Sequence, residues 1–320
     1  MRLSSLVFLV AVFVLVSVGY TLLNSNFLEK DGLSIKSPLP AFLTKVFPSV
    51  LGNNTFWRPK DEFVVSNEKK PVITAQAAIS YDLTTNKFLY QKNLKQKLPM
   101  ASLTKIMTAI VALENDDITK EYTVSQKAAQ VGENSMGLSE GEVYTLKDLL
   151  YGLILHSGND AAETITQGSR FGRENFIYLM NKKVEDLGLS DTHFTNPSGL
   201  EGDGYQYSTT YDLLVMTKYA LENPTFAKVV STVEYEIPYT DKHKYIYLFN
   251  ETNLLTSYPG VKGIKTGYTD EAGLCLITYL EYGGHKIIAV LLNSQSRRGE
   301  MKDLLDYSLR TFGVKPPPHN

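Results

Sequence analysis

The sequence predicts one domain of the α/β class, in its α+β form, behind an apolar N-terminal segment and a connector. The 320 residues exceed an average domain and suit one large α/β domain with appended segments. Strand-like runs stand near the beginning and the end of this domain, and helix-like runs fill the part between them. The expected strands lie at about Val72–Tyr81, Lys87–Gln91, Val261–Lys265, Gly273–Glu281 and Lys286–Asn293.

The expected helices begin at recognisable start signals. Pro99 precedes an Ala-rich apolar run, which is typical of a buried helix. Threonine followed three residues later by aspartate is a second start signal, and it occurs at Thr145 and at Thr209. The expected helices cover about residues 101–113, from Thr145 to near Ser157, from Thr209 through Leu221, and about 300–312.

The N-terminal segment, residues 1–23, predicts export from the cytoplasm. Arg2 precedes an apolar run from Leu3 to Leu23, and about 20 apolar residues are enough to cross a bilayer. A cleavable signal has a shorter apolar core and a small-x-small site, for which Ser17-Val18-Gly19 is a candidate, yet the run continues beyond it. We therefore expect a single-pass signal anchor in the cell membrane with the domain on the extracytoplasmic face; cleavage and secretion are the alternative.

The rest of the chain divides into three parts. Residues 24–70 are rich in Pro, Asn and Lys without sustained periodicity, and we interpret them as a tether. Residues 71–314 form the expected domain, and residues 315–320 form a short tail that includes three successive prolines.

Composition argues against several classes of function. The formal net charge of −2 and the pI near 6.2 give no support for nucleic-acid binding. Cys275 is the single cysteine, stands in an apolar run, and is expected to be a buried strand residue. The five histidines show no metal-binding spacing, so we expect neither a metal nor a cofactor: His156, His193, His243, His285 and His319.

Three short motifs follow one another along the chain: Ser102-Leu103-Thr104-Lys105, Ser157-Gly158-Asn159 and Lys265-Thr266-Gly267. A serine and a lysine three residues apart share one face of a helix, so Lys105 can reach the hydroxyl of Ser102 as its base. Ser66-Asn67-Glu68-Lys69 has the same spacing, but it lies in a polar stretch and is interpreted as solvated linker.

This ordered set marks the penicillin-recognising serine acyl-transferases. The flanking residues make the chain resemble one branch of them, the low-molecular-mass D-alanyl-D-alanine carboxypeptidases, over roughly Val72 to Gly313. The resemblance implies an antiparallel sheet flanked by helices with a mainly helical subdomain. It also implies two partners, the D-Ala-D-Ala end of a peptidoglycan stem peptide and β-lactam antibiotics. The segments that carry it are Pro99–Lys105, Leu138–Glu142, His156–Ala162, Asn196–Leu200 and Gly263–Thr269.

The residue types fit covalent catalysis by a serine. Ser102 is a poor nucleophile until a base takes its proton, and Lys105 can do so only while its amine is neutral. Burial and the nearby cation Lys265 would lower its pKa. Ser157 is expected to relay the proton toward the leaving amine. Backbone N–H groups at the helix start can hold the oxyanion, and the family resemblance adds the N–H of Tyr268.

A second group of residues is expected to bind the substrate. Asn159 can position the peptide amide. Lys265 and Thr266 can bind a terminal carboxylate, and Gly267 leaves the strand open to the substrate backbone. The family resemblance adds an assisting arginine, which is Arg297 or Arg298.

Several alternatives remain open at this point. A D,D-endopeptidase would differ from a carboxypeptidase only in the leaving group. A β-lactamase needs a base for rapid deacylation, for which Glu201 and Asp203 are the nearest candidates by position. An inactive wall-binding scaffold would not need Lys105. The family resemblance further implies a C-terminal membrane helix in many members, and we expect the N-terminal segment to replace it here.

Overall fold

The computed structural model describes residues 56–319. The predicted signal anchor, residues 1–23, and most of the predicted tether lie outside the described residues. Within residues 56–319, no helix combines the length and the apolar character that a membrane span requires.

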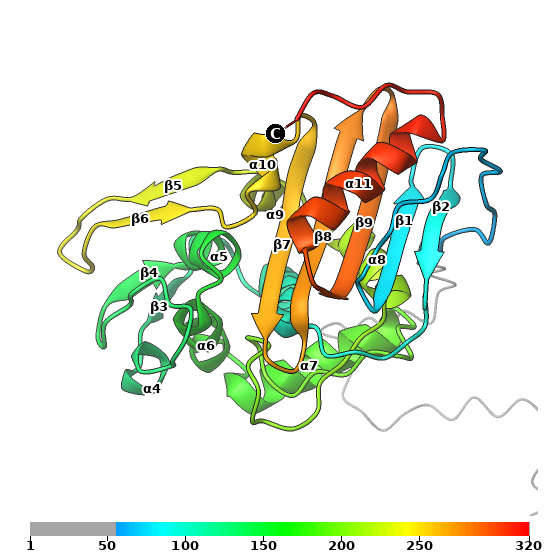
Figure 1. The fold of residues 1–320 in the computed structure, drawn as a ribbon. Helices are drawn as coiled ribbons and strands as arrows, with labels where there is room; N and C mark the ends of the chain where they lie inside the picture. Colours follow the sequence, from blue (N-terminus) through cyan, green and yellow to red (C-terminus); the bar gives the residue numbers. More distant parts are fainter. Residues whose placement is uncertain (1–55, 320) are drawn as a thin grey trace, which may run out of the picture. The chain divides into compact units, whose positions relative to one another are not determined.

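A five-stranded antiparallel sheet in the order β2-β1-β9-β8-β7 forms the centre of the domain (Figure 1). Its strands come from both ends of the described chain, as the sequence predicts, and the fold class is confirmed. Strand β1 is buried along its whole length because both faces of the sheet are covered. The strands are β1 (Ala77–Asp82), β2 (Lys87–Lys92), β7 (Val261–Thr269), β8 (Gly273–Tyr282) and β9 (His285–Ser294).

Different helices cover the two faces of this sheet. Helix α11 (Arg297–Arg310) crosses the face that looks toward the viewer in Figure 1, where its leucines pack against alternate residues of β8 and β9. Helix α8 (Thr210–Leu221) packs on the opposite face, against β9 and β1. That second face continues into a larger apolar core shared with the remaining helices.

The mainly helical part is built around α3 (Lys105–Asn115), which contacts α5, α6, α7 and α8. A single 3₁₀ turn, η1 (Ala101–Thr104), leads into α3. The other helices are α4 (Gln126–Ala129), α5 (Leu146–Leu155), α6 (Asn159–Gly168), α7 (Gly172–Asp186), α9 (Pro224–Val230) and α10 (Leu254–Ser257). The predicted start signals are N-caps: the Thr145 hydroxyl accepts from the Asp148 N–H and the Thr209 hydroxyl from the Asp212 N–H.

Two small antiparallel hairpins complete the domain: β3 (Glu121–Thr123) with β4 (Val143–Thr145), and β5 (Glu234–Ile237) with β6 (Ile246–Phe249). The β5–β6 hairpin projects to the left of the sheet in Figure 1.

The domain starts earlier than residue 71, because the compact unit begins at Phe56. The Trp57 ring meets the Tyr81 ring edge-on at 5.5 Å between centroids, and the Phe63 ring stacks on Phe88 at 5.2 Å. Residues 56–64 therefore pack on the domain and are not part of a tether.

The predicted tail, residues 315–320, also packs on the domain as far as it is described. The His319 ring stacks on Tyr258 at 4.6 Å between centroids, and its Nε2 lies 2.9 Å from the carboxylate of Asp306. The C-terminal residues 315–319 therefore belong to the domain.

Candidate active site

Ser102 lies in the η1 turn at the start of the central helix. It is half-buried, and the residue before it, Ala101, has a φ of 48°, which is uncommon for a residue with a side chain. The turn is held in this conformation by β7, which packs directly against it. Residues held in such conformations cluster at functional sites.

Lys105 is fully buried and its amine has three partners: its Nζ lies 2.9 Å from Ser102 Oγ, 2.7 Å from Asn159 Oδ1 and 2.8 Å from the carbonyl oxygen of Ser198. Two of these partners can only accept a hydrogen bond, whereas a hydroxyl can also donate. A neutral amine, with two hydrogens and one lone pair, satisfies all three. The geometry therefore suits an amine that accepts the Ser102 proton.

The surroundings of Lys105 favour this neutral form. Burial, and then the neighbouring charge of Lys265, hold the pKa of Lys105 well below its usual value. Carboxylates at Glu251, Asp160 and Glu133 act in the opposite direction, but the lowering effects prevail. These are the two causes that the sequence analysis expected, and burial is the larger.

Asn159 and Ser157 come from the segment where α5 ends and α6 begins. The Asn159 Nδ2 donates to the carbonyl of Gly132 at 3.0 Å, which orients its Oδ1 toward Lys105. Ser157 is buried, has a φ of 57°, and lines the same cleft as Ser102.

The third motif lies on β7 beside the nucleophile turn. Lys265 is buried, and its Nζ donates to the carbonyl of Thr266 at 3.1 Å. Burial, helped by the Arg297 guanidinium and opposed by Glu251, lowers the pKa of Lys265 to about 8. Thr266, Gly267 and Tyr268 line the cleft with Ser102.

Gly267 has a steric reason to be glycine. A Cβ at this position would stand 3.1 Å from the carbonyl oxygen of Met100 and 3.2 Å from the backbone nitrogen of Ser102. The strand backbone therefore runs close beside the N–H of the nucleophile, where two backbone donors can converge. The side chain of the next residue, Tyr268, is 57% exposed, and its hydroxyl donates to Asp270.

The structure distinguishes the two candidate arginines. Arg297 begins α11, lines the cleft, and donates from Nη1 to the carbonyl of Gly267 at 2.6 Å. Arg298 is exposed and does not line the cleft. Of the two candidates, Arg297 is thus the arginine that lies in the cleft.

A loop that the sequence analysis noted without assigning a role completes the Lys105 site. The Asn196 Oδ1 accepts from the N–H groups of Ser198 and Gly199, which aims the Ser198 carbonyl at Lys105. Gly199 has a φ of 90°, and a Cβ there would stand 2.0 Å from the Ala101 carbonyl oxygen. Only glycine lets this loop pack against the nucleophile turn.

Comparison with known proteins identifies the family of this site. The family described as D-alanyl-D-alanine carboxypeptidase, peptidase S11, matches residues 64–296, and all three motifs lie within that range. The chain belongs to the D-alanyl-D-alanine carboxypeptidase family. The resemblance stated from the motifs is confirmed.

Individual members of the D-alanyl-D-alanine carboxypeptidase family support this assignment. The carboxypeptidase DacF of Bacillus subtilis is 36% identical over 76% of this chain, which spans 64% of that relative. DacB2 of Mycobacterium tuberculosis is 32% identical, covering 76% of this chain and 83% of the relative. The Streptomyces K15 DD-transpeptidase structure has a TM-score of 0.72 at 32% identity, covering 76% of this chain and all of that chain.

Some cleft residues of this family member were missed by sequence reasoning. Glu133 and Asn134 enter from the loop between α4 and β4, and Glu251 enters from the segment after β6. They line a cavity of about 130 Å³ together with Ser102, Ser157, Asn159, Thr266, Gly267, Tyr268 and Arg297. Asp160 lies behind them, accepting from the N–H groups of residues 136, 137 and 138, and so holds the loop in place.

The weaker candidates lie elsewhere. Asp203 pairs with Arg173 at 3.0 Å, and Glu201 accepts from the N–H of Glu271, so neither faces the nucleophile as a deacylation base. Within residues 56–319, no three His, Cys, Asp or Glu side chains are grouped to hold a metal. Cys275 is fully buried, as expected, and burial raises the pKa of its thiol to about 11.

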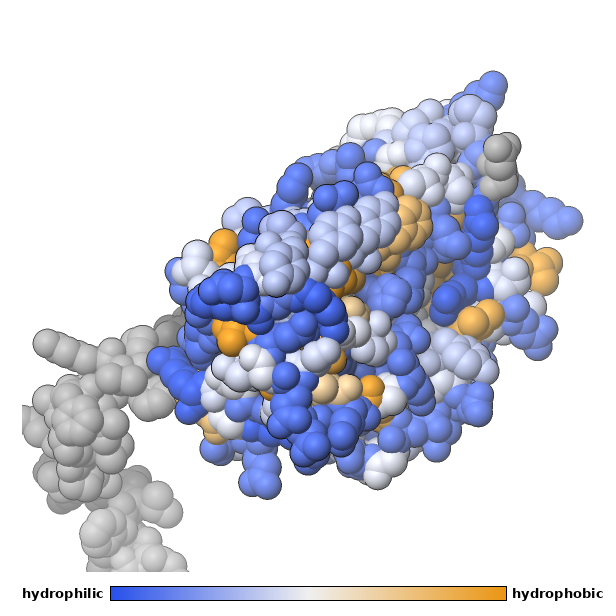
Figure 2. All heavy atoms as spheres, turned by 90° about the vertical axis from the view of Figure 1, so that its left-hand side faces the viewer, coloured by the Kyte–Doolittle hydropathy of each residue, from blue (hydrophilic) through white to orange (hydrophobic). Residues whose placement is uncertain are grey.

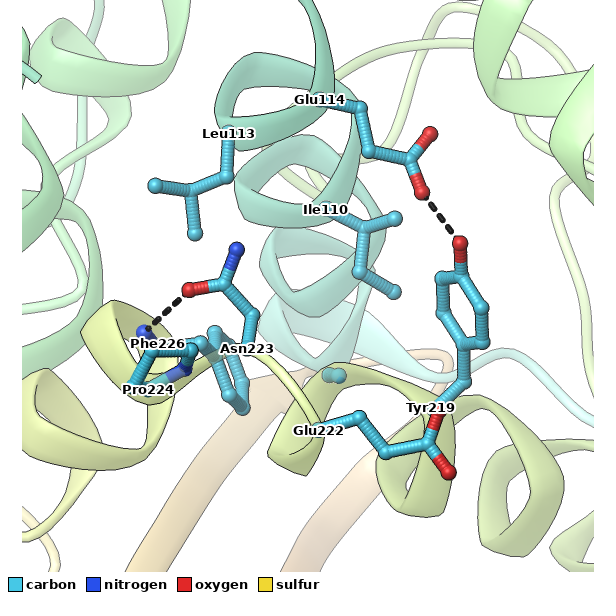
Figure 3. A pocket seen from close by; sticks show the side chains of 9 residues that line it. Ile110, Leu113, Glu114, Tyr219, Glu222, Asn223, Pro224 and Phe226 are labelled. Atoms are coloured by element: carbon cyan, nitrogen blue, oxygen red, sulfur yellow. Dashed lines mark hydrogen bonds between the residues drawn. The ribbon is translucent and has the colours of Figure 1, made fainter. Parts of the chain in front are cut away.

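A larger hollow of about 310 Å³ lies between α3 and the α8–α9 turn (Figure 3). Its walls are mostly apolar, and Glu114 at one side accepts from the Tyr219 hydroxyl. It contains none of the motif residues, so its size does not make it the reaction site.

Proposed function

We propose that the protein is a serine D,D-carboxypeptidase that removes the terminal D-Ala from peptidoglycan stem peptides. The observation that carries the proposal is the 2.9 Å approach of a fully buried Lys105 amine to the Ser102 hydroxyl. Its lowered pKa favours the neutral form of the amine, which is the form that can act as a base.

The first half of the reaction forms an acyl-enzyme. Lys105 takes the Ser102 proton while Oγ attacks the carbonyl carbon of the penultimate D-Ala. The backbone N–H groups of Ser102 and Tyr268 stabilise the resulting oxyanion. When the C–N bond breaks, the proton on Lys105 passes through the Ser157 hydroxyl to the departing amine. The products are free D-Ala and an ester on Ser102.

Water completes the cycle. Lys105, neutral again, takes a proton from a water molecule that attacks the ester carbonyl, and the proton returns to the Ser102 oxygen as the ester bond breaks. A β-lactam follows the same first step, because its strained amide presents a carbonyl and a carboxylate in comparable positions. It therefore acylates the same serine.

Specificity for a chain end resides in the cationic side of the cleft. Thr266 and Arg297 line the cleft with the nucleophile, the buried Lys265 lies directly behind Thr266, and together they suit a free carboxylate. An internal peptide bond, as cut by an endopeptidase, brings a leaving group whose carboxylate need not reach this point.

Three substrates test the proposal: a diacyl D-Ala-D-Ala peptide, a cross-linked stem-peptide dimer and a chromogenic cephalosporin. We expect D-Ala release from the first, slower cleavage of the second, and stable acylation without turnover by the third. Preferential cleavage of the dimer would replace the proposal with an endopeptidase. Rapid cephalosporin turnover would replace it with a β-lactamase, and inertness toward all three with a scaffold.

We also propose that residues 1–23 remain as a membrane anchor, with the domain on the extracytoplasmic face where peptidoglycan lies. The apolar run after Arg2 supports this. The protein should stay with membranes through salt and carbonate washes. N-terminal sequencing that finds a mature chain beginning at Tyr20 or shortly after would show cleavage and contradict the anchor.

A further inference from the structure

The outer face of the β5–β6 hairpin carries a row of exposed aromatic rings. Tyr245, Tyr247 and Phe249 are 51%, 49% and 48% exposed, whereas the residues between them, Ile246 and Leu248, are buried. The alternation follows from the two-residue period of a strand. Figure 2, viewed from the end where the hairpin projects, shows pale blue ring-bearing side chains gathered on this surface.

Two carboxylates share this face. Glu236 pairs across the hairpin with Tyr247, and Glu234 pairs with Phe249. Both are exposed, and Glu234 accepts a hydrogen bond from the Tyr247 hydroxyl. The face thus offers flat apolar rings next to hydrogen-bond acceptors.

The hairpin is fixed in place from its inner side. Tyr235 of β5 stacks on Tyr151 of α5 at 3.6 Å between ring centroids, and His243 near the hairpin tip stacks on Tyr144 at 4.5 Å. A rigid support of this kind keeps the outer rings presented without the entropy cost of ordering them on binding.

The aromatic row leads toward the catalytic cleft. The next residue in the two-residue alternation, Glu251, lines that cleft, and its N–H donates at 3.0 Å to the carbonyl of Leu155, two residues before Ser157. A long substrate whose chain end lies at Ser102 can therefore extend past Glu251 onto this face.

We propose that the face formed by Tyr245, Tyr247, Phe249, Glu234 and Glu236 binds the glycan strand that carries the stem peptide. This inference rests on the proposed function, because it places the remainder of that substrate. Aromatic rings stack on the apolar C–H faces of sugars, and carboxylates accept from their hydroxyl and amide groups. Glu234 and Glu236 would repel an anionic bilayer. The charge of this face therefore favours a neutral polysaccharide as the ligand.

The kinetic test compares two substrates with the same D-Ala-D-Ala end, one linked to an uncross-linked glycan strand and one free of sugar. The full-length protein carrying Tyr245→Thr, Tyr247→Thr and Phe249→Thr should show a KM about tenfold higher for the glycan-linked substrate. Its kcat/KM for the sugar-free peptide should not change. Threonine retains strand propensity, so the hairpin should stay folded.

Tyr178→Thr is the matched control, because Tyr178 is 64% exposed on α7, away from the hairpin. It should leave both substrates unaffected. An equal loss on both substrates in the triple variant would show damage to the cleft and overturn the inference. An unchanged KM for the glycan-linked substrate would overturn it as well.

A binding assay separates this inference from the proposed function. Glycan strands stripped of their stem peptides, with the freed carboxyl groups amidated so that the strand stays neutral, should bind the wild-type protein about tenfold more tightly than the triple variant. If the strands bind in this way while neither peptide is cleaved, the proposed function fails and the glycan surface stands. If both peptides are cleaved and the strands bind both proteins equally, the proposed function stands and only the glycan surface is ruled out.

A spin label tests the membrane as the alternative occupant. A label at Tyr247→Cys that becomes lipid-buried in vesicle-reconstituted protein would assign the face to the membrane instead.

Discussion

At the scale of single residues, the chemistry depends on one amine whose pKa is lowered by burial and by the charge of Lys265. Lys105 has no carboxylate within ion-pair distance among the described residues, and its polar partners are an amide oxygen, a carbonyl and the nucleophile. Each of these can be satisfied by a neutral amine. A buried lysine that kept its proton would lack the charge partner that burial normally requires.

Lys105→Arg tests this assignment. Arginine keeps the positive charge but cannot lose its proton near pH 7, so acylation by a fluorescent penicillin should slow by roughly 10²–10⁴. Lys69→Arg, at the exposed lysine of the similar linker motif, should leave the rate unchanged. A near-normal rate in Lys105→Arg would mean that another group takes the proton.

The two lysines predict a bell-shaped dependence of kcat/KM on pH. Activity should rise with pH as Lys105 loses its proton, and it should fall as pH passes through the Lys265 pKa of about 8, because a neutral Lys265 no longer attracts the substrate carboxylate. In Lys265→Arg the alkaline fall should move to higher pH, since the guanidinium stays charged. An alkaline limb that does not move would assign it to another group.

Sequence motifs located the side chains that we propose to react, but not the groups that hold them in place. Ser102, Lys105, Asn159 and Lys265 were predicted. Ser102 and Asn159 line one cleft, Lys105 is buried beneath them and bonded to both, and the charge of the buried Lys265 acts on Lys105. The Ser198 carbonyl was not predicted because every residue has one. Glu251 was not predicted because a lone glutamate between a strand and a helix carries no pattern.

At the scale of elements, continuous apolar strands were predictable, whereas helices α6 and α7, which bear many polar residues, and the short hairpins were not predicted. Strands β8 and β9 lie within one residue of their predicted bounds, because continuous apolar runs mark strands covered on both faces. The β3–β4 and β5–β6 hairpins were missed. Strands of three or four residues such as β3 and β5 are too short to show a period.

The loop at residues 196–200 provides a prediction at this scale. Gly199→Ala should lower both stability and penicillin acylation, because the added Cβ meets the Ala101 carbonyl at 2.0 Å. Gly202→Ala is the matched control, since Gly202 also has positive φ but open space around it. In the control, the free energy of unfolding should fall only by the conformational cost of a side chain at positive φ, roughly 1–2 kcal/mol, and the acylation rate should not change. Equal effects in the two variants, by thermal unfolding and labelling rate, would contradict the steric account.

At the scale of the whole molecule, the domain extends further along the chain than composition indicated. Polar residues in 56–70 resemble a linker, but the apolar side chains among them, Trp57 and Phe63, pack on aromatic residues of the sheet. Isolated aromatic residues in a polar segment give no periodic signal, so only the folded structure reveals this contact.

A chain beginning at Phe56 should therefore be more stable than one beginning at Pro71. Losing the packing of Trp57 and Phe63 should lower Tm by roughly 5 °C or more, given about 2–4 °C per kcal/mol for a domain of this size. Thermal unfolding of the two truncated chains measures the difference. Equal Tm values would show that residues 56–70 contribute no stability.

The central claim is that Ser102 is the nucleophile, and penicillin labelling followed by mass spectrometry tests it most directly. The acyl adduct should lie on the peptide that contains Ser102, Ser102→Ala should abolish labelling, and Ser66→Ala should leave it intact. An adduct on Ser157, Ser66 or any other residue, or labelling that survives in Ser102→Ala, would contradict the account.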